Sequence, residues 1–228
     1  MIEGPFQEGG QWFWRARKGD DQGEVEVRFA GRGAREERED VLHHIEPDAP
    51  SVAWAKQFHS ARVLPAHPGN CGEGDALFSD APDLALSVVT ADCVPILLAG
   101  PQGLAAVHAG WRGLVGGVIP AALQAAGGGE GWTAWIGPTI GPCCYEVGED
   151  VAEQVAAVGG PDVVIPGPDR PHLDLVAAAR HQLKAAGVEE VYSVASCTRC
   201  EAERLYSYRR EGQAVGRNAA FIWRRSVL

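Results

Sequence analysis

Three runs of aliphatic and β-branched residues follow one another closely in the middle of the chain. They cover residues 84–90, 94–98 and 104–108, and turn residues such as Gly100 and Pro101 separate them. Each run has the length of a strand. Parallel neighbours need a crossover connection of about a dozen residues or more, which is longer than the connections found here. The runs therefore predict sheets that are mixed or mainly antiparallel, and they exclude a purely parallel sheet.

Strand-like and helix-like segments alternate along the rest of the chain. Residues 24–29 alternate between polar and apolar side chains, as half-exposed strands do. Helical spacing occurs at residues 35–44, 114–126, 149–158 and 173–186, and further strand-like runs occur at residues 132–136, 191–194 and 219–223. No long linker or internal repeat divides these segments, so we expect a single α/β domain that spans residues 1–228.

The composition is that of an ordinary folded protein with an acidic surface. The 228 residues carry a formal net charge of −10, and the isoelectric point is near 5.1. Such a chain is poorly suited to bind a nucleic-acid backbone or an anionic membrane, although it can still contain a local basic pocket. No apolar run reaches the roughly 18 residues that span a bilayer, and the N-terminus lacks a signal-peptide pattern. We therefore expect a cytoplasmic protein without nucleic-acid or membrane partners, and the sequence leaves its oligomeric state open.

A cysteine and a histidine stand at the ends of two neighbouring apolar runs. Cys93 lies just past the run at residues 84–90, and His108 ends the run at residues 104–108, so these runs, as neighbouring strands, would bring both side chains into one pocket. The two residue types are zinc or copper ligands and also a nucleophile–base pair. His59 ends another strand-like segment and would complete a set of two histidines and one cysteine with an open fourth position, as in catalytic zinc sites. Such side chains also pack without a metal, and their spacing alone leaves these interpretations open.

Several polar and aromatic residues accompany this set. Asp92, beside the cysteine, would hydrogen-bond a ligand histidine or cap a turn. Arg112 would contact an anionic or planar substrate or remain a solvated turn residue. Tyr145 would stack on a substrate ring or pack as an ordinary aromatic side chain. Arg217 belongs to a basic and aromatic C-terminal segment that would form either a salt-bridged strand edge or part of a phosphate site.

Four further cysteines form two pairs in the sequence. Cys143 and Cys144 are adjacent, and Cys197 and Cys200 form a CxxC motif. In a reducing compartment such residues are free thiols or metal ligands rather than disulfides. Together they would build a structural zinc site, but adjacent cysteines seldom bind one tetrahedral ion, so we expect buried structural thiols.

With these motifs the chain resembles the multicopper polyphenol oxidoreductase, or laccase-domain, family, whose members are also described as purine nucleoside phosphorylases. The matching segments are Gln57–Ser60, Gly72–Leu77, Thr90–Pro95, His108–Gly113, Gly137–Pro138 with Tyr145–Gly148, Cys197–Thr198, and Tyr208–Arg210 with Gly216–Arg217. They cover roughly residues 50–225 in the order of the family. The resemblance implies an α/β/β/α sandwich related to the catalytic domain of cytotoxic necrotizing factor.

The resemblance also implies a zinc ion held by His59, Cys93 and His108. The N-terminal segment departs from the family pattern, in which a Thr-Arg-x-Gly-Gly-Val-Ser motif supplies substrate contacts. Of that motif the chain keeps an arginine that matches Arg17 and one glycine. We expect the phosphate to be bound by arginines chosen from Arg17, Arg112 and Arg217, and Tyr145 to contact the substrate.

Three functions follow from this resemblance. The first, which we favour, is a zinc-dependent enzyme that phosphorolyses adenosine, inosine or methylthioadenosine and deaminates adenosine, with His59, Cys93, His108 and Asp92 as catalytic residues. The second is a copper-dependent polyphenol oxidase, which seven histidines without a His-x-His pair disfavour. The third is a cysteine hydrolase that uses Cys93 and His108 to edit cell-wall precursors. Zinc is the expected cofactor, with copper as the alternative.

Overall fold

The computed structural model of the chain describes residues 1–20, 22–33, 35, 37–213 and 216–225. One group of strands comprises β1 (Glu3–Glu8), β2 (Gln11–Asp20), β3 (Gly23–Ala30), β4 (Val52–Lys56), β6 (Gly69–Glu73), β8 (Ala85–Thr90) and β15 (Asn218–Arg225). A second comprises β5 (Val63–Pro65), β7 (Ala76–Ser79), β9 (Val94–Gly100), β10 (Gly103–Ala109), β11 (Thr133–Ile136) and β14 (Glu190–Ser193). A short ribbon pairs β12 (Val164–Ile165) with β13 (His172–Leu173).

The helices are interspersed among these strands. They are α1 (Arg38–Ile45), α2 (Trp111–Val115), α3 (Val118–Ala125), α4 (Glu149–Gly159), the 3-10 helix η1 (Pro161–Val163), α5 (Leu175–Ala185) and α6 (Tyr208–Glu211). Among the described residues, none of these helices has the length and apolar content needed to cross a membrane.

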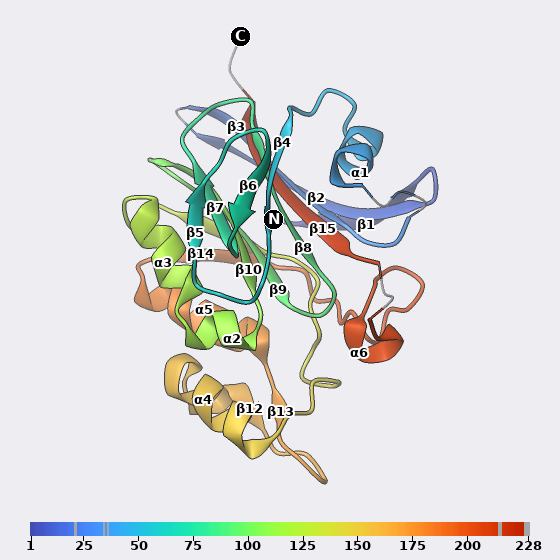
Figure 1. Cartoon of the computed structure of the whole chain (residues 1–228), viewed down its shortest axis with the longest axis vertical. Coiled ribbons are helices and arrows are strands. Elements are labelled where there is room, and N and C mark those ends of the chain that lie inside the picture. Colours follow the sequence, from blue (N-terminus) through green and yellow to red (C-terminus); the bar gives the residue numbers. More distant parts are fainter. Residues whose placement is uncertain (21, 34, 36, 214–215, 226–228) are drawn as a thin grey trace.

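The strands form two mixed sheets (Figure 1). The seven-stranded sheet has the order β1-β2-β3-β15-β8-β4-β6, and the six-stranded sheet has the order β14-β11-β9-β10-β7-β5. The pairs β4–β8, β4–β6, β5–β7 and β11–β14 are parallel, and the other pairs in these sheets are antiparallel. The mixed and mainly antiparallel α/β architecture expected from the short connections is confirmed.

The three central apolar runs do not all lie in one sheet. β9 and β10 form the expected antiparallel pair, with Val94 opposite Ala109. β8 instead pairs with β4 and β15 in the seven-stranded sheet, so the runs at residues 84–90 and 104–108 are not neighbouring strands. Residues 91–93 carry the chain from one sheet to the other, with Asp92 at a φ of 97°. Both sheets are covered on both faces, so each of the three runs is apolar throughout. The sequence therefore does not reveal that the chain passes from one sheet to the other between the first run and the second.

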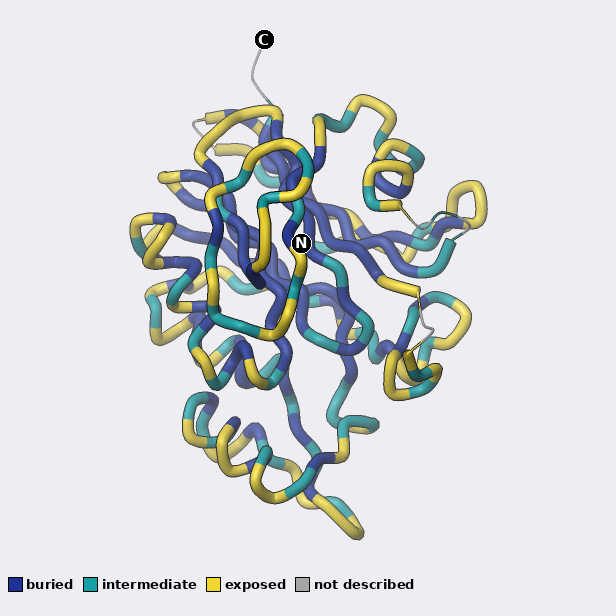
Figure 2. Tube along the Cα trace, in the orientation of Figure 1, coloured by how far each residue is buried: buried dark blue, intermediate teal, exposed yellow. Residues whose placement is uncertain are grey.

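The two sheets pack face to face and carry helices on their outer faces. The layer between the sheets contains alternate strand residues such as Leu86 and Ile222 from one sheet and Leu97 and Trp135 from the other. Helix α1 covers the outer face of the seven-stranded sheet, and α2 to α5 cover the outer face of the six-stranded sheet. Figure 2 shows the strands buried inside this stack and the exposed residues on helices and loops.

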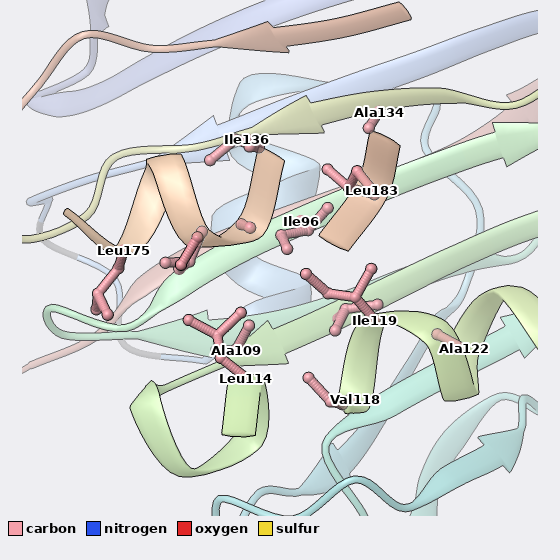
Figure 3. Packing of buried hydrophobic residues seen from close by; sticks show 14 of the residues in the cluster. Ile96, Ala109, Leu114, Val118, Ile119, Ala122, Ala134, Ile136, Leu175 and Leu183 are labelled. Atoms are coloured by element: carbon pink, nitrogen blue, oxygen red, sulfur yellow. The ribbon is translucent and has the colours of Figure 1, made fainter. Parts of the chain in front are cut away.

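Aliphatic side chains attach the helices to the six-stranded sheet. Figure 3 shows Leu114, Ile119 and Leu183 of three helices meeting Ile96 and Ile136 of two strands. All five are at most 2% exposed. Burial of each such side chain contributes about 1.5–3 kcal/mol to the free energy of folding. The helical layer therefore holds the ends of β9, β10 and β11 in fixed relative positions.

Two helix predictions differ in detail from the structure. The run at residues 114–126 was expected to form one helix, but it forms α2 and α3 on either side of Gly117, whose φ of 77° favours glycine. The segment at residues 35–44 becomes helical only from Arg38 onward, and Glu36 lies outside the described residues. Helix α5 begins at Leu175 because the Asp174 side chain accepts a hydrogen bond from the Ala177 amide.

Candidate metal centre

Three side chains of the types that bind metal ions lie close together. Each of His59, Cys93 and His108 places one donor atom within 4.8 Å of the others. The distance from Cys93 Sγ to His59 Nε2 is 3.7 Å, and the two imidazole rings lie edge to face with centroids 5.0 Å apart. His108 is buried, Cys93 is half-buried and His59 is exposed. Two imidazoles and a thiol in this arrangement could hold a metal ion on three sides.

The backbone explains why the three donors converge. His108 lies on β10 opposite Pro95 of β9, two residues beyond Cys93. His59 follows β4, and its φ of 67° turns the chain back toward the end of β10. Thus Cys93 and His108 do meet, but through the pairing of β9 with β10 rather than of the run at residues 84–90 with the run at residues 104–108. His59 arrives through a turn that the sequence pattern did not indicate.

Asp75 organises this cluster, although the sequence analysis did not identify it as a functional residue. Its Oδ1 lies 2.7 Å from Nδ1 of His108 and accepts the His59 amide at 2.9 Å. Its Oδ2 accepts both the amide and the hydroxyl of Ser60 at 2.7 Å. The bond to Nδ1 fixes the orientation of His108 and leaves Nε2 to serve as a ligand, as carboxylates commonly do for zinc-binding histidines.

One sequence signal could have revealed Asp75, because this residue lies within Gly72–Leu77, one of the segments that resemble the family. It directly precedes β7, and Ala76 lies opposite Val107, the neighbour of His108. An aspartate at the start of a buried strand is an unusual residue for a position that is 1% exposed. The carboxylate bonded to a histidine of this set is therefore Asp75 rather than Asp92.

The electrostatics of the cluster favour a charged thiolate. Burial alone would raise the pKa of Cys93, but hydrogen bonds and charges from His108 and His59 outweigh it and lower the pKa to about 6. Burial would likewise lower the pKa of His108, yet Asp75 and Cys93 raise it to about 9. Asp75 has a pKa well below its usual range, because hydrogen bonds from His108 and Ser60 outweigh its burial. The thiolate form is the one that binds metals or attacks carbon.

Gly110 leaves room beside the donors. A Cβ atom at this position would lie 2.9 Å from Cδ2 of His59 and 3.0 Å from Sγ of Cys93. Because the φ of Gly110 is −74°, the backbone itself would accept other residues, and the space alone requires glycine. The donor chemistry and this open space both fit a bound metal ion.

A cavity of ≈ 780 Å³ opens beside the three donors. This volume lies within the range of small-molecule sites. Its basic side chains are Arg38, Lys56, Arg112, Arg209 and Arg217, and its aromatic side chains are Trp54, Trp111, Tyr145 and Tyr208. In a chain with a net charge of −10 this basic lining is a local feature, and it suits an anionic ligand that also carries a flat ring.

Tyr145 and Arg209 form one wall of the cavity. The Arg209 guanidinium lies 5.2 Å from the centroid of the Tyr145 ring, and it donates a hydrogen bond to the Glu146 carbonyl at 2.9 Å. Burial and the nearby Cys93 raise the pKa of Tyr145 to about 12, so its hydroxyl stays protonated at neutral pH. The predicted ring contact therefore lies in the cavity, beside Arg209 of the basic and aromatic C-terminal segment that the sequence offered as part of a phosphate site.

Asp92 lines the cavity, but its carboxylate is engaged elsewhere. Its Oδ1 accepts the Thr198 hydroxyl at 2.6 Å, and its Oδ2 accepts the Arg209 amide at 2.7 Å. The Asp92 carbonyl also accepts the Thr139 hydroxyl at 2.6 Å. These bonds connect three loops around the cavity, so the observed contacts of Asp92 are those of a positioning residue.

The three arginines predicted to bind phosphate do not all lie at the cavity. Arg112 lies at the cavity, with its guanidinium 4.4 Å from the ring centroid of Trp111, and Arg217 also lines the cavity. Arg17 does not join them, because it lies on β2 and pairs with Glu26, with Nε 3.0 Å from a carboxylate oxygen. Arg17 and Glu26 occupy opposing positions in β2 and β3, which explains the pairing.

The four cysteines that were expected to be buried structural thiols also lie close together. Cys143, Cys144, Cys197 and Cys200 place their sulfur atoms within 4.8 Å of one another. Cys143 and Cys200 are exposed and the other two are half-buried, so the expectation of buried structural thiols is wrong. A turn at residues 142–144 directs the adjacent cysteines to the same side, which an extended chain would not do.

Comparisons with known proteins place the chain among a set of bacterial relatives. A family model described as multi-copper polyphenol oxidoreductase laccase matches residues 27–225. The purine nucleoside phosphorylase YfiH of Shigella flexneri is 39% identical over 177 residues, which cover 75% of this chain and 72% of the relative. A purine nucleoside phosphorylase of Streptomyces coelicolor is 37% identical over 215 residues, which cover 90% of this chain and 84% of the relative.

Solved structures show the same fold. The crystal structure of a Neisseria meningitidis protein is 30% identical and matches with a TM-score of 0.75, covering 99% of this chain and 98% of that one. YlmD from Geobacillus stearothermophilus is 28% identical and matches with a TM-score of 0.74, covering 95% of this chain and 93% of that one.

Proposed function

Because the chain belongs to the multi-copper polyphenol oxidoreductase laccase family, we propose that it is a zinc-dependent purine nucleoside phosphorylase, formed by a single domain over residues 1–228. The observation that carries this proposal is the position of the His59, Cys93 and His108 donors at the wall of a cavity lined by arginines and aromatic rings. The similarity to relatives named purine nucleoside phosphorylases supports the choice of substrate.

We propose that His59, Cys93 and His108 hold the metal and that Asp75 orients His108 toward it. Zinc suits one thiolate and two imidazoles, and three protein donors leave a fourth position open, as catalytic zinc sites do. When bound, the ion acts as a Lewis acid toward an oxygen of the substrate or of water. A multicopper oxidase would need further histidine clusters, and among the described residues the other metal-binding group consists of cysteines alone.

The cavity residues would bind the two substrates separately. Phosphorolysis joins a phosphate oxygen to C1′ of the ribose while the bond from C1′ to the purine nitrogen breaks and its electrons leave with the base. Arg112, Arg209 and Arg217 can bind phosphate oxygens through paired N–H donors. Tyr145 can stack on the purine or donate a hydrogen bond to it as negative charge develops, because its hydroxyl stays protonated.

The proposal also names the nucleosides that the enzyme would act on. Adenosine, inosine and methylthioadenosine share the purine and ribose that this cavity would bind. An open position beside three metal donors also suits hydrolytic deamination of adenosine, since that reaction needs an activated water. We propose both activities for the same site, with phosphorolysis as the principal one.

One observation favours a second candidate function. The lowered pKa of Cys93 and the raised pKa of His108 describe a thiolate–imidazolium pair, which is the resting state of many cysteine hydrolases. Such an enzyme could edit cell-wall precursors without a metal. The two functions exclude each other in practice, because a thiolate that binds zinc tightly is not a free nucleophile.

Product analysis of the purified, metal-quantified protein separates the two functions. The protein is incubated with adenosine, with and without phosphate, and the products are resolved by chromatography. We expect adenine whose formation depends on phosphate, along with some inosine, and we expect both to disappear in Cys93→Ala. The Cys71→Ser variant is the matched control, because Cys71 is half-buried on β6 and belongs to neither metal-binding group. Unchanged adenosine with metal-loaded protein would refute the phosphorylase.

A further inference from the structure

The cluster of Cys143, Cys144, Cys197 and Cys200 has the dimensions of a tetrahedral thiolate site. Two sulfur–sulfur distances are 3.7 Å (Cys143 to Cys200) and 3.4 Å (Cys144 to Cys200), and all four sulfurs lie within 4.8 Å of one another. Zinc–sulfur bonds of about 2.3 Å in a tetrahedron place sulfurs about 3.8 Å apart. A disulfide would require a separation of about 2.05 Å. The sulfurs are therefore spaced for a shared ion.

Topology brings the two cysteine pairs together. β11 and β14 are adjacent parallel strands, with Ile136 opposite Ser193, so the loops that follow them leave the sheet side by side. The loops then continue in register, because Thr139 and Cys197 form a parallel bridge. Residues 143–144 and 197–200 thus meet through backbone pairing, and their proximity does not depend on side-chain rotation alone.

The backbone hydrogen-bonds one sulfur of the cluster, that of Cys197. Cys197 Sγ accepts the Gly141 amide at 3.2 Å, and the amides of Cys200 and Arg199 also hydrogen-bond to it. Amide donors stabilise the negative charge of a thiolate, which is the form that binds a metal ion. The loop backbone therefore favours Cys197 as a ligand.

We propose that Cys143, Cys144, Cys197 and Cys200 bind a second zinc ion in a closed, structural site distinct from the His59–Cys93–His108 centre. Four thiolates complete the tetrahedral coordination of zinc and leave no position for water. The adjacent cysteines take part because Cys144 and Tyr145 both donate their amides to the Gly141 carbonyl, which closes a tight turn. A Cβ on Gly141 would lie 3.3 Å from Cys143 Sγ, so this turn is tightly packed against the sulfur.

This second ion would fix one wall of the substrate cavity. Tyr145 directly follows Cys144 and lines the cavity. Thr198 directly follows Cys197, and its hydroxyl holds Asp92 at 2.6 Å. The zinc would join these two loops through their cysteines. Its role is therefore to hold Tyr145 and Asp92 in place.

Metal analysis of the full-length protein tests the proposal independently of catalysis. We expect about two zinc ions per chain in the wild type, and about one in Cys200→Ser and in Cys143→Ser. Both substituted positions are exposed, so the variants do not empty the core. Cys71→Ser should retain about two zinc ions. X-ray absorption of the Cys93→Ala protein should show the remaining zinc bound by sulfur alone.

Three results would overturn the proposal. The first is an unchanged zinc content in Cys200→Ser and Cys143→Ser. The second is ready alkylation of all four cysteines in native, zinc-loaded protein, because bound thiolates are protected. The third is the recovery of these thiols only after reduction, which would identify a disulfide instead. Loss of phosphorylase activity bears on the first centre and leaves this test unaffected.

Discussion

The two groups of metal-binding side chains found in the described part of the chain are built in different ways. The His59–Cys93–His108 centre combines nitrogen and sulfur donors, lies at strand ends and is braced by the buried carboxylate of Asp75. The four-cysteine cluster joins two loops, has two exposed and two half-buried cysteines, and accepts the Gly141 amide at Cys197. In the two sites as proposed, the number of donors and their surroundings, more than the presence of sulfur, separate a centre open to substrate from a closed one.

Substituting one cysteine in each group gives the largest expected difference between the two groups. Cys93→Ala removes a donor from the open centre, and we expect kcat/KM for nucleoside phosphorolysis to fall by at least about 10³-fold, which corresponds to several kcal/mol of transition-state stabilisation. Cys200→Ser leaves the open centre intact and loosens only the cavity wall, so kcat/KM should fall much less, and thermal stability should fall as well. Steady-state kinetics and thermal unfolding of both variants measure this. An equal loss of activity in both would mean that the groups do not differ in role.

Thiol reactivity in metal-free protein gives the next largest effect. Cys93 has a pKa of about 6, and the pKa of Cys200 is about 11. At pH 7 Cys93 is mostly thiolate, whereas Cys200 is almost entirely protonated. Allowing for the weaker nucleophilicity of a low-pKa thiolate, iodoacetamide should modify Cys93 on the order of 100-fold faster.

The pH profile of this alkylation tests whether the pKa of Cys93 is lowered or raised. Because the pKa of Cys93 is lowered, its alkylation rate should be constant above about pH 7 and fall as pH drops through about 6. The rate at Cys200 should still be rising at pH 10. Peptide mapping by mass spectrometry resolves the sites, and added zinc should protect both. A midpoint for Cys93 near the ordinary thiol value of about 8.5 would contradict the proposed histidine pair.

The sequence predicted the open centre far better than the closed cluster. Cys93 and His108 flank consecutive apolar runs, and local antiparallel pairing is enough to bring their strand ends together. The four cysteines meet only because β11 and β14 pair in parallel across more than fifty intervening residues. Such long-range pairing leaves no local pattern, so the tight turn that joins Cys143 and Cys144 could not be anticipated either.

Strand pairing between distant segments also explains why the sequence did not predict the roles of some charged residues around the open centre. Asp75 resembles a turn residue before a strand, and its role depends on β7 lying beside β10. Arg17 was selected by position in a family motif, but β3 places Glu26 opposite it and draws the side chain away from the cavity. Local patterns thus identified donors on consecutive strands, and tertiary contacts decided which charged residues support them.

Asp75 is the feature of the open centre that the cysteine cluster lacks. Asp75→Asn keeps the size of the side chain but removes the negative charge that faces Nδ1 of His108. We expect zinc affinity and kcat/KM to fall by about 10–100-fold, as for other carboxylates that support a ligand histidine. Competition with a chelator, combined with kinetics, measures both. Asp80→Asn, in an exposed loop, is the matched control, and an equal effect there would show that Asp75 has no special role.

The smallest expected effect concerns the space beside the open centre. Gly110→Ala places a methyl group 2.9 Å from His59 and 3.0 Å from Cys93, in a backbone conformation that alanine accepts. The two donors must shift by a few tenths of an ångström, which costs about 1 kcal/mol at this buried position. Zinc affinity of the open centre should therefore fall about fivefold to tenfold, while the cysteine cluster keeps its ion. Gly19→Ala, which meets no atom within 4 Å, controls for the substitution itself. If Gly110→Ala instead binds zinc as tightly as the wild type, the donors are free to rearrange, and the preformed geometry would no longer distinguish this centre from the loop-built cluster.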